Sequence, residues 1–361
     1  MKDLVDSRNE INKIDSEMAA LFERRMNECK NVVEYKMANS MPIFDGSREE
    51  AVINNNLKNI KDDSLKEYYV RFIKSVMEIS KSYQSAKLSG LKVAYSGVKG
   101  AYGFIAAKHM FPNCELVAMD NFTKAYESVE NGTNDRVILP IENSFVGDVG
   151  EVMDLLFQGS LYINSIYNLH INHCLIVNDG ATLDSIKKVV SHPQALAQCS
   201  KFIQEHNFVT EDEVNTAYAG KKLKELGNTD IAVIGSKETA EEYGLNILKE
   251  NINNTNTNTT RFASLSRVML NTKNEDVSKK SFIIVFTVKN TAGALAKCLD
   301  IIGAYGFNMR NLRSRLMQDL MWTYYFFCEI EGDYDTEEGE EMMTALKVFC
   351  DRLKIVGSYV S

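Results

Sequence analysis

The chain has 361 residues, a length that suggests two or three domains and not a single core. Hydrophobic residues make up 45% and charged residues 25%, which is typical of a soluble globular protein. The formal net charge is −8 and no basic run is visible, so general binding to nucleic acid is disfavoured. An anionic small molecule remains possible as a ligand. Its site would need locally clustered cations, because the chain as a whole carries a net negative charge.

No apolar run is long enough to span a bilayer, and the charged start has no apolar segment of a secretory signal. The seven cysteines stand singly, without a CxxC pair, as reduced intracellular thiols do. These features predict a cytoplasmic protein. His170 and His173 could form a metal pair, but the alternation of NLHINHCLIV favours a structural strand.

Residues 3 to 87 have a helical pattern almost throughout. The apolar residues of one predicted helix face recur at spacings of three, four or seven: Leu4, Ile11, Ile14, Met18, Leu21 and Val32. This first helix is expected to run to about Asn39. A second should open at the capping box of Ser47 and Glu50, and a third should run from about Ser64 to Lys87. The region is therefore predicted to be all-α.

Three cations on the first predicted helix could serve one anion or could simply be solvated. Arg25 and Lys36 are eleven residues apart, which places them within about 20° of one face and roughly 16 Å apart along the axis. Arg8 would lie roughly 42 Å from Lys36 on a straight helix. If all three bind one ligand, Arg8 must come from a second copy, which predicts an interlocked dimer.

The pattern R8…R25…K36…D45-x-x-R48-E49…S80-x-x-x-Q84 resembles the bacterial all-helical chorismate mutases over residues 1–87. The resemblance implies three-helix protomers that form a homodimer or a dimer of dimers, with Arg8 donated across the interface. It further implies that Arg8, Arg25 and Arg48 hold the substrate carboxylates and that Lys36 and Gln84 face the ether oxygen as the catalytic pair. Asp45, Glu49 and Ser80 would complete substrate binding.

From Leu91 to about Arg267 the pattern changes to alternating strands and helices, which predicts an α/β region with a largely parallel sheet. Its length allows two lobes with a cleft between them. The predicted strands are LKVAYSG, ELVAMD, RVILPI, HCLIV, KKVVSH and DIAVIG. GVKGAYG follows the first strand, but its spacing does not fit a dinucleotide-binding loop. It is either an anion-binding turn or an ordinary glycine-rich turn, and the polar clusters PIENS and SHPQALAQC are equally open.

Taken together, GVKGAYGFIAA, LPIENSFVGDV, HCLIV, SHPQALAQC, AVIGSKETAEEYGLNIL and NTTRF resemble prephenate dehydratase over about 91–268. The family has two α/β lobes like those of periplasmic binding proteins, with the site in the cleft. The resemblance implies that the cleft is lined by Asn143, Ser144, Ser191, Gln198, Thr260, Arg261 and Phe262, with Glu142 beside them. We expect Thr260 to contact the leaving hydroxyl and Arg261 to bind the carboxylate.

Two positions depart from the family pattern, since many members carry a hydroxyl residue in place of Gly103 and an acidic residue in place of Tyr218. The asparagine-rich segment 251–257 is expected to be a variable lead-in without a site of its own. Thr260 and Arg261 would then lie on the final loop of the cleft. The joint to the next domain is predicted at NTKNEDVSKK.

Residues 280–361 predict the order βαββαβ, which is the ferredoxin-like arrangement. TAGALAKCL and NMRNLRSRL resemble the ACT regulatory domain, in which such segments bind phenylalanine between two domains. The resemblance implies effector contacts from Gly293, Ala294, Leu295, Ser314 and Arg315. Arg313 and Leu316 replace the acidic residue and the proline of the family motif, so a dimerising domain without a ligand is the alternative.

The three regions predict a multidomain enzyme with a mutase domain at 1–87, a dehydratase domain at 91–268 and an ACT domain at 280–361. Chorismate and prephenate are the expected substrates, L-phenylalanine the expected inhibitor, and no cofactor, metal, nucleic acid or membrane is required. A mutase fused to a prephenate dehydrogenase would need a dinucleotide fingerprint, which is missing. The other alternative is an amino-acid sensor that kept the two-lobed fold without catalysis.

Overall fold

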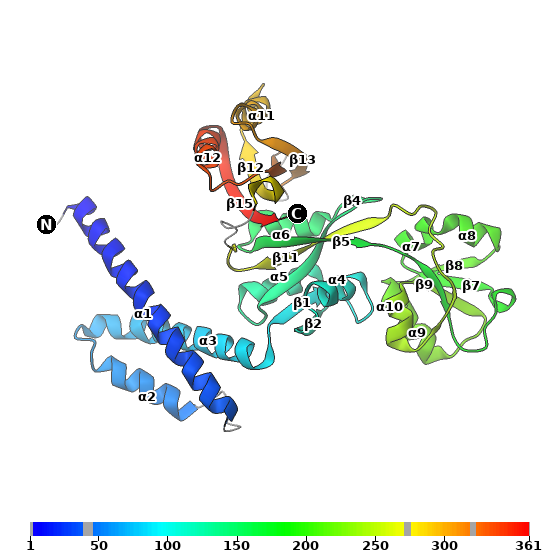
Figure 1. The fold of residues 1–361 in the computed structure, drawn as a ribbon, viewed down its shortest axis with the longest axis horizontal. Helices are drawn as coiled ribbons and strands as arrows, with labels where there is room; N and C mark the ends of the chain where they lie inside the picture. Colours follow the sequence, from blue (N-terminus) through cyan, green and yellow to red (C-terminus); the bar gives the residue numbers. More distant parts are fainter. Residues whose placement is uncertain (1–2, 39–45, 271–275, 318–322, 361) are drawn as a thin grey trace. The chain divides into compact units, whose positions relative to one another are not determined.

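The structure is a computed structural model that describes residues 3–38, 46–270, 276–317 and 323–360 (Figure 1). The chain forms two compact units, Met1–Leu91 and Lys92–Ser361. No helix in these described ranges is both long enough and apolar enough to cross a membrane.

The first unit consists of three helices, α1 (Leu4–Ala38), α2 (Gly46–Leu57) and α3 (Lys66–Ser89). The predicted apolar face of α1 exists, but little of it is covered within one chain. Val33 is buried in α1, and Ile73 and Met77 are buried in α3. By contrast, the side chains of Leu4, Ile11 and Leu21 are more than half exposed, at 62%, 55% and 57%. One chain therefore leaves a long apolar stripe open along α1.

The first lobe of the second unit is built on strands in the order β5-β11-β3-β1-β2. These strands are β5 (Tyr162–His170), β11 (Thr259–Ser266), β3 (Arg136–Asn143), β1 (Lys92–Ser96) and β2 (Glu115–Met119), with β4 (Gly147–Asp148) paired to the end of β3. The helices of this lobe are α4 (Tyr102–Met110), α5 (Phe122–Glu130) and α6 (Gly150–Gln158). β1, β2 and β3 run parallel, whereas β11 is antiparallel to both β3 and β5.

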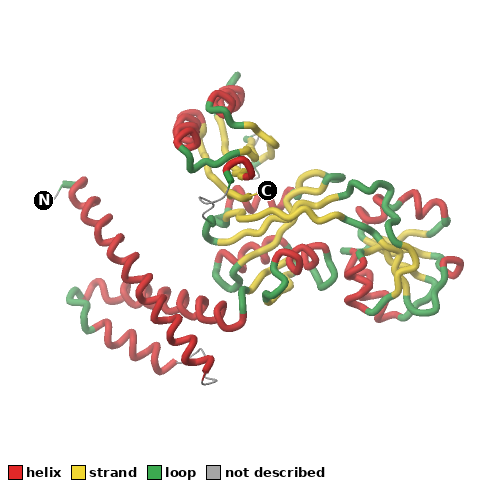
Figure 2. Tube along the Cα trace, in the orientation of Figure 1, coloured by secondary structure: helices red, strands yellow, loops and turns green. Residues whose placement is uncertain are grey.

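The second lobe has its own five-stranded sheet in the order β10-β6-β9-β7-β8. Figure 2 draws its strands in yellow, with helices in red beside them. Its strands are β10 (Asn246–Lys249), β6 (Cys174–Val177), β9 (Ile231–Gly235), β7 (Lys188–Ser191) and β8 (Val209–Asp212). Its helices are α7 (Pro193–Gln198), α8 (Ser200–Glu205), α9 (Thr216–Leu226) and α10 (Lys237–Tyr243). All four residues of β6 are buried, which is why CLIV reads as a continuous apolar run.

The chain crosses between the lobes twice, at residues 171–173 and 250–258, and the two crossings are bonded to each other. The backbone N–H of Ile171 donates to the carbonyl of Asn258 at 2.8 Å. The N–H of His173 donates to Oδ1 of Asn253 at 2.7 Å, and the N–H of Ile252 donates to the His173 carbonyl at 3.0 Å. The asparagine-rich segment is therefore hydrogen-bonded to the other crossing between the lobes.

The C-terminal part of the second unit has the predicted βαββαβ order. Its elements are β12 (Lys280–Val288), α11 (Ala294–Ala304), β13 (Asn308–Leu316), β14 (Tyr324–Glu331), α12 (Glu337–Phe349) and β15 (Cys350–Val360). The strand order is β13-β14-β12-β15, and β15 continues the sheet of the first lobe by pairing Gly357 with Ile163 of β5. This part therefore shares a sheet with the first lobe.

Four sequence expectations are wrong in detail. The sheets are mixed and not largely parallel, because strands bordering the lobe crossings run antiparallel to their neighbours. NTTRF ends in β11, inside a sheet, and is not a loop. NLHINHCLIV is divided between β5 and β6, which belong to different sheets. The last helix, predicted for TEEGEEMMTALKVFCDRL at 336–353, ends at Phe349, since residues 350–353 already belong to β15.

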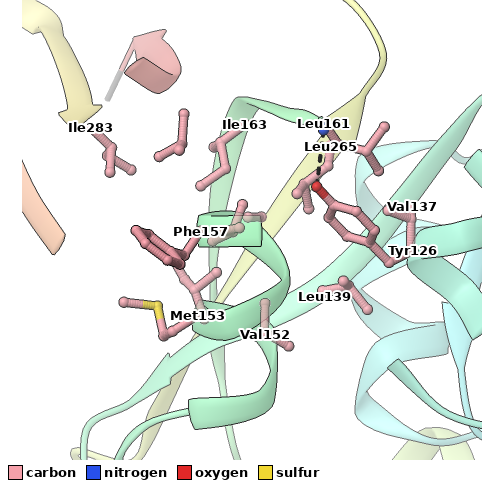
Figure 3. Close-up of a cluster of buried hydrophobic side chains, with 14 of the residues drawn as sticks. Tyr126, Val137, Leu139, Val152, Met153, Phe157, Leu161, Ile163, Leu265 and Ile283 are labelled. Atoms are coloured by element: carbon pink, nitrogen blue, oxygen red, sulfur yellow. Dashed lines mark hydrogen bonds between the residues drawn. The ribbon is translucent and has the colours of Figure 1, made fainter. Parts of the chain in front are cut away.

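The largest core lies where the first lobe meets the C-terminal part (Figure 3). Val137, Leu139 and Leu265 of the lobe are fully buried there, as is Ile283 of β12. In Figure 3, Ile283 lies on the same side of α6 as Phe157 and Met153. This continuous core binds the C-terminal part to the lobe.

Candidate functional site

In the helical unit, α1 and α3 bring two predicted mutase residues into contact. Nη1 of Arg25 donates to Oγ of Ser80, which is itself buried and donates to the Val76 carbonyl at 2.7 Å. Gln84 follows Ser80 by one helical turn, and its Oε1 is buried with no hydrogen-bond partner in the described part of the chain. Arg25, Ser80 and Gln84 therefore lie on one side of the α1–α3 pair, where they present polar groups to the same space.

Other predicted mutase residues are not brought together within one chain. Arg8 and Lys36 lie at opposite ends of the single helix α1, so their separation of roughly 42 Å along the axis stands. Asp45 lies outside the described residues. Arg48 and Glu49 belong to the first turn of α2, but their side chains are also outside the described part of the structure.

The second unit contains a cavity of about 540 Å³ between its lobes. Four helices of eight or more residues begin at its wall: α4, α5, α6 and α9. Their N-cap residues Ala101, Asn121, Val149 and Asn215 all line the cavity. Among the described residues, no side chain caps the start of α4. Because free N–H groups and the positive end of the helix dipole point at such a space, it favours an anionic ligand.

A chain of amides and a hydroxyl forms one side of the cavity. Nδ2 of Asn143 donates to Oγ1 of Thr260 at 2.9 Å and to Oδ1 of Asn258 at 2.9 Å. The amide orientation of Asn143 is fixed because its Oδ1 accepts from the N–H groups of Phe145 and Val146. Thr260 thus receives a hydrogen bond, which leaves its own hydroxyl proton free to be donated into the cavity.

The same chain continues into the second lobe through Gln198. Its Oε1 accepts from Nδ2 of Asn258 at 2.9 Å and faces Nε2 of His173 at 2.8 Å. The Nε2 atom of Gln198 is buried and has no hydrogen-bond partner among the residues that the structure describes, and Gln198 lines the cavity. The arrangement therefore offers a ligand one buried, unused amide donor from Gln198.

His173 and Tyr102 were not predicted as site residues, although both line the cavity. Since Oε1 of Gln198 can only accept, Nε2 of His173 carries the proton and Nδ1 accepts from the Tyr102 hydroxyl at 3.0 Å. Burial lowers the pKa of His173, against a smaller opposing effect of the Gln198 bond, so the imidazole is neutral. The sequence signal for His173 was its place at the start of HCLIV, a segment that resembles prephenate dehydratase, but the residue had been interpreted as part of a structural strand.

The charged groups at the cavity are not those expected from the sequence. Among the described residues that line it there is no lysine or arginine, whereas Asp120 and Glu151 are present. Glu151 accepts from the Thr123 hydroxyl at 3.0 Å, and Asp120 is paired with Lys124 at 2.6 Å. Carboxylates of a ligand would therefore be bound by N–H groups and neutral side chains.

The structure corrects the predicted role of Arg261. Thr260 is opposite Asn143 and Arg261 is opposite Glu142 in the β11–β3 ladder, so alternation sends Arg261 to the face away from the cavity. Its guanidinium donates to both carboxylate oxygens of Glu329 at 2.8 Å and to Glu142 at 3.1 Å. Burial lowers the pKa of Arg261, but its bonds to Glu329 more than offset this and raise it. Arg261 is thus part of a contact with the C-terminal part.

Ser144 and Ser191 were also expected in the cleft, and neither lines the cavity. Ser144 is exposed, and its Oγ bonds the backbone of Thr257 and Thr259 at 3.0 and 2.9 Å. Ser191 is fully buried and donates to the Ile234 carbonyl at 2.6 Å, between β7 and β9. Both hydroxyls hold backbone segments near the site. Of the predicted cleft residues, four do line the cavity: Asn143, Gln198, Thr260 and Phe262.

The predicted effector residues lie on two elements of the C-terminal part. Gly293, with φ of 79°, is the N-cap of α11, and Ala294 and Leu295 open that helix. Ser314 is exposed on β13. The guanidinium of Arg315, also on β13, is bonded to Asp154 of α6 at 2.8 and 3.1 Å. Arg315 is therefore engaged by the first lobe instead of being open to a ligand.

Sequence profiles of two families match the chain. The profile described as "Chorismate mutase type II" matches residues 7–85, and that described as "Prephenate dehydratase" matches residues 93–269. The chain is 34% identical over 280 residues to an arogenate dehydratase/prephenate dehydratase of Arabidopsis thaliana, covering 75% of this chain and 73% of that one.

A solved structure and a full-length relative extend this comparison. The prephenate dehydratase of Arthrobacter aurescens in complex with L-Phe superposes with a TM-score of 0.70 at 26% identity, covering 75% of this chain and 90% of the other. A bifunctional chorismate mutase/prephenate dehydratase of Buchnera aphidicola is 31% identical over 374 residues, covering 99% of this chain and 97% of the relative. The chain belongs to the family of bifunctional chorismate mutase/prephenate dehydratases and carries both activities.

Proposed function

We propose that the cavity between the lobes binds prephenate and that the Thr260 hydroxyl donates a hydrogen bond to the leaving ring hydroxyl, which departs as water with a proton taken up from solvent. The observation that supports this proposal most directly is the hydrogen bond that Thr260 accepts from Asn143. Because Oγ1 of Thr260 is the acceptor in this bond, its own proton can be donated to a ligand. Loss of CO2 and water yields phenylpyruvate and an aromatic ring, so the chemistry is driven once the hydroxyl can leave. A positioned donor in a preorganised site typically lowers such a barrier by about 3 kcal/mol.

The carboxylates of prephenate are assigned to the helix starts and to Gln198 in place of Arg261. Supporting this are the N-terminal residues of α4, α5 and α9 in the cavity wall and the unpaired Nε2 of Gln198. Preorganised N–H donors in a site shielded from water stabilise anions strongly, because no reorganisation is needed on binding.

For the mutase step we propose that Arg25 and Arg48 bind the chorismate carboxylates and that Lys36 and Gln84 face the ether oxygen. The rearrangement is pericyclic and needs no acid, base or covalent intermediate, so the protein must hold a compact conformer and stabilise charge on the breaking bond. The contact of Arg25 with Ser80, one helical turn from Gln84 on α3, supports this assignment. Asp45, Glu49 and Ser80 complete the proposed binding set.

A second copy of the chain is proposed to supply Arg8. The apolar residues along the open face of α1 have the spacing of a helix-packing surface, and their exposure in one chain supports burial against a partner. Arg8 lies too far from Lys36 on the same helix to share a ligand with it. The mutase is therefore proposed to act as a homodimer or as a dimer of dimers.

The βαββαβ part is proposed to be an ACT domain that mediates feedback inhibition by L-phenylalanine in phenylalanine biosynthesis. Support comes from the strand order of this part and from the L-Phe complex of the Arthrobacter relative. Gly293 to Leu295 and Ser314 are the proposed contacts. Arg315 could join them only by giving up its bonds to Asp154.

Arogenate is a second candidate substrate of the same cavity. It carries an ammonium group where prephenate has a keto group, and Asp120 and Glu151 are carboxylates at the cavity wall. The Arabidopsis relative bears both dehydratase names. This candidate adds a substrate without changing the proposed role of Thr260.

One assay tests the proposal. Purified protein is given chorismate without cofactor, and prephenate and phenylpyruvate are measured for the parent and for Thr260→Val. The parent should form phenylpyruvate, while the variant should accumulate prephenate with dehydratase turnover reduced by about 10²-fold or more. Full turnover by the variant would move the donor role elsewhere. A parent that stops at prephenate would argue for the mutase alone, and no turnover at all would favour the sensor.

A further inference from the structure

Helix α6 has one end at the dehydratase cavity and its other side against the C-terminal part. Val149, which precedes the helix, and Glu151 in its first turn line the cavity. One turn later, Asp154 accepts two bonds from Arg315, at 3.1 and 2.8 Å, and a third from the Tyr325 hydroxyl at 2.7 Å. The bonds to Asp154 raise the pKa of Arg315, as expected for a close ion pair.

The hairpin that leads into α6 is held from the same strand of the C-terminal part. Arg313 forms ion pairs with Glu142 at the end of β3 and with Asp148 on β4. The neighbouring residue Asn143 pairs with Gly147 across this hairpin and carries the bond to Thr260. Arg313 therefore binds one side of the β3–β4 hairpin through Glu142 and Asp148, and Asn143 of the same hairpin lines the cavity.

Arg313 and Arg315 are two residues apart on β13, so both point to the same face of the strand. Their side chains are 18% and 30% exposed, and their carboxylate partners are 16–25% exposed, so these pairs are better shielded from water than ordinary surface pairs. Between them, the two arginines bind both ends of the continuous stretch from Glu142 to Asp154. This stretch supplies one wall of the cavity.

We propose that Arg313 and Arg315 are positioning residues for the dehydratase reaction. They act through Glu142, Asp148 and Asp154 to hold the β3–β4 hairpin and the start of α6 in place. The C-terminal part is then a structural half of the dehydratase site, and a ligand that moved β13 would move the cavity wall. The proposal rests on the dehydratase activity and does not require an effector.

The test measures both activities on the same full-length chain. Arg313→Gln and Arg315→Gln should each lower dehydratase kcat/KM by about 10- to 100-fold, the scale of a wall displaced by up to 1 Å. Mutase activity should stay within about twofold, since its residues lie in the other compact unit. Arg315→Lys, which keeps the charge, should recover part of the loss, and the exchange of Asp154→Arg with Arg315→Asp should recover more than either single change.

Arg310→Gln is the matched control. Arg310 lies on the same strand, but its ion pair at 2.8 Å is with Glu331 of β14, within the C-terminal part. This variant should retain the dehydratase kcat/KM of the parent. Dehydratase activity unaffected by Arg313→Gln and Arg315→Gln would overturn the proposal. So would an equal loss of both activities, with a lower melting temperature and no recovery in Arg315→Lys, because the pairs would then serve folding alone.

Discussion

Gln198 illustrates how the neighbours of one side chain decide what it offers a ligand. Its Oε1 is used by Asn258 and faces His173, so its amide nitrogen is left buried and unpaired at the cavity. An unpaired buried donor costs roughly 1–3 kcal/mol of folding free energy. A ligand oxygen that accepted this bond would recover that cost, which is the role proposed for Gln198.

His173 should set the acid limit of the dehydratase. Its buried imidazole has a pKa below the ordinary value of 6.5, so the unfolded chain takes up the proton first as pH falls. Stability should therefore be full above about pH 6.5 and should decline below it. Dehydratase kcat should fall once His173 itself is protonated, because a charged imidazole disturbs Gln198 and Tyr102. His173→Gln keeps a hydrogen-bond donor and does not titrate. It should therefore reduce the decline of both folding stability and dehydratase kcat at acid pH.

The measurement compares parent and His173→Gln in urea unfolding and in dehydratase kcat between about pH 5 and 7.5, with the uncatalysed loss of prephenate subtracted. His192 is replaced separately by Asn, since it also lines the cavity and burial lowers its pKa too. Acid limbs that are unchanged in His173→Gln but altered in His192→Asn would transfer the effect to His192.

At the scale of elements, the sequence predicted most helices and buried strands, because apolar periodicity is a local property. It did not predict which face of β11 meets the cavity. NTTRF places Thr260 and Arg261 side by side, and a motif alone assigns both to the ligand. Only the pairing with β3 separates them, sending Thr260 toward Asn143 and Arg261 toward Glu142. Such pairings join residues more than one hundred positions apart, which no local pattern contains.

The junction of β15 with β5 depends on a residue without a side chain. A Cβ atom at Gly357 would lie 2.5 Å from both Cβ and the carbonyl oxygen of Ile163. Gly357→Val should therefore separate the two strands and lower the unfolding free energy of the second unit by about 1–3 kcal/mol, the usual cost of overpacking. Calorimetric melting of the full chain would measure this loss.

Gly303→Ala provides the control for that change. Gly303 lies inside α11, and an added Cβ there would meet no atom within 4 Å. This variant should be neutral or more stable by about 0.5–1 kcal/mol, since alanine favours a helix over glycine. Equal melting temperatures for Gly357→Val and the parent would show that the two strands can part without cost.

For the whole molecule, the sequence predicted which region carries the mutase and which carries the dehydratase. It did not predict how the C-terminal part packs against the dehydratase lobe. The helical and α/β textures change near Gly90, and the two family matches lie on either side of that change. The C-terminal part, expected as an independent unit, instead shares a core and a sheet with the first lobe. Arg313 illustrates this difference. It replaces the acidic residue of the family's effector motif, and its side chain forms an ion pair with Glu142 of the first lobe.

Mixing two inactive chains should restore the mutase if Arg8 crosses between copies. Arg8→Ala and Lys36→Ala each damage both shared sites of a homodimer. In a mixed dimer, one site receives both substitutions and the other receives neither. Random pairing of equal amounts makes about half of the dimers mixed, so about a quarter of the parent mutase activity should return. The two chains are unfolded and refolded together, with separately refolded chains combined afterwards as the control.

A mutase site built within one chain predicts a different recovery of activity on mixing. If Arg8 and Lys36 served the same chain, or if Arg8 were only a solvated cation, mixing would return no more than the average of the two separate activities. The dehydratase on each chain should remain constant throughout and reports the amount of folded protein. Recovery near one quarter, with constant dehydratase, would therefore require a site built from two copies of α1, whose exposed apolar face supplies the surface for that pairing.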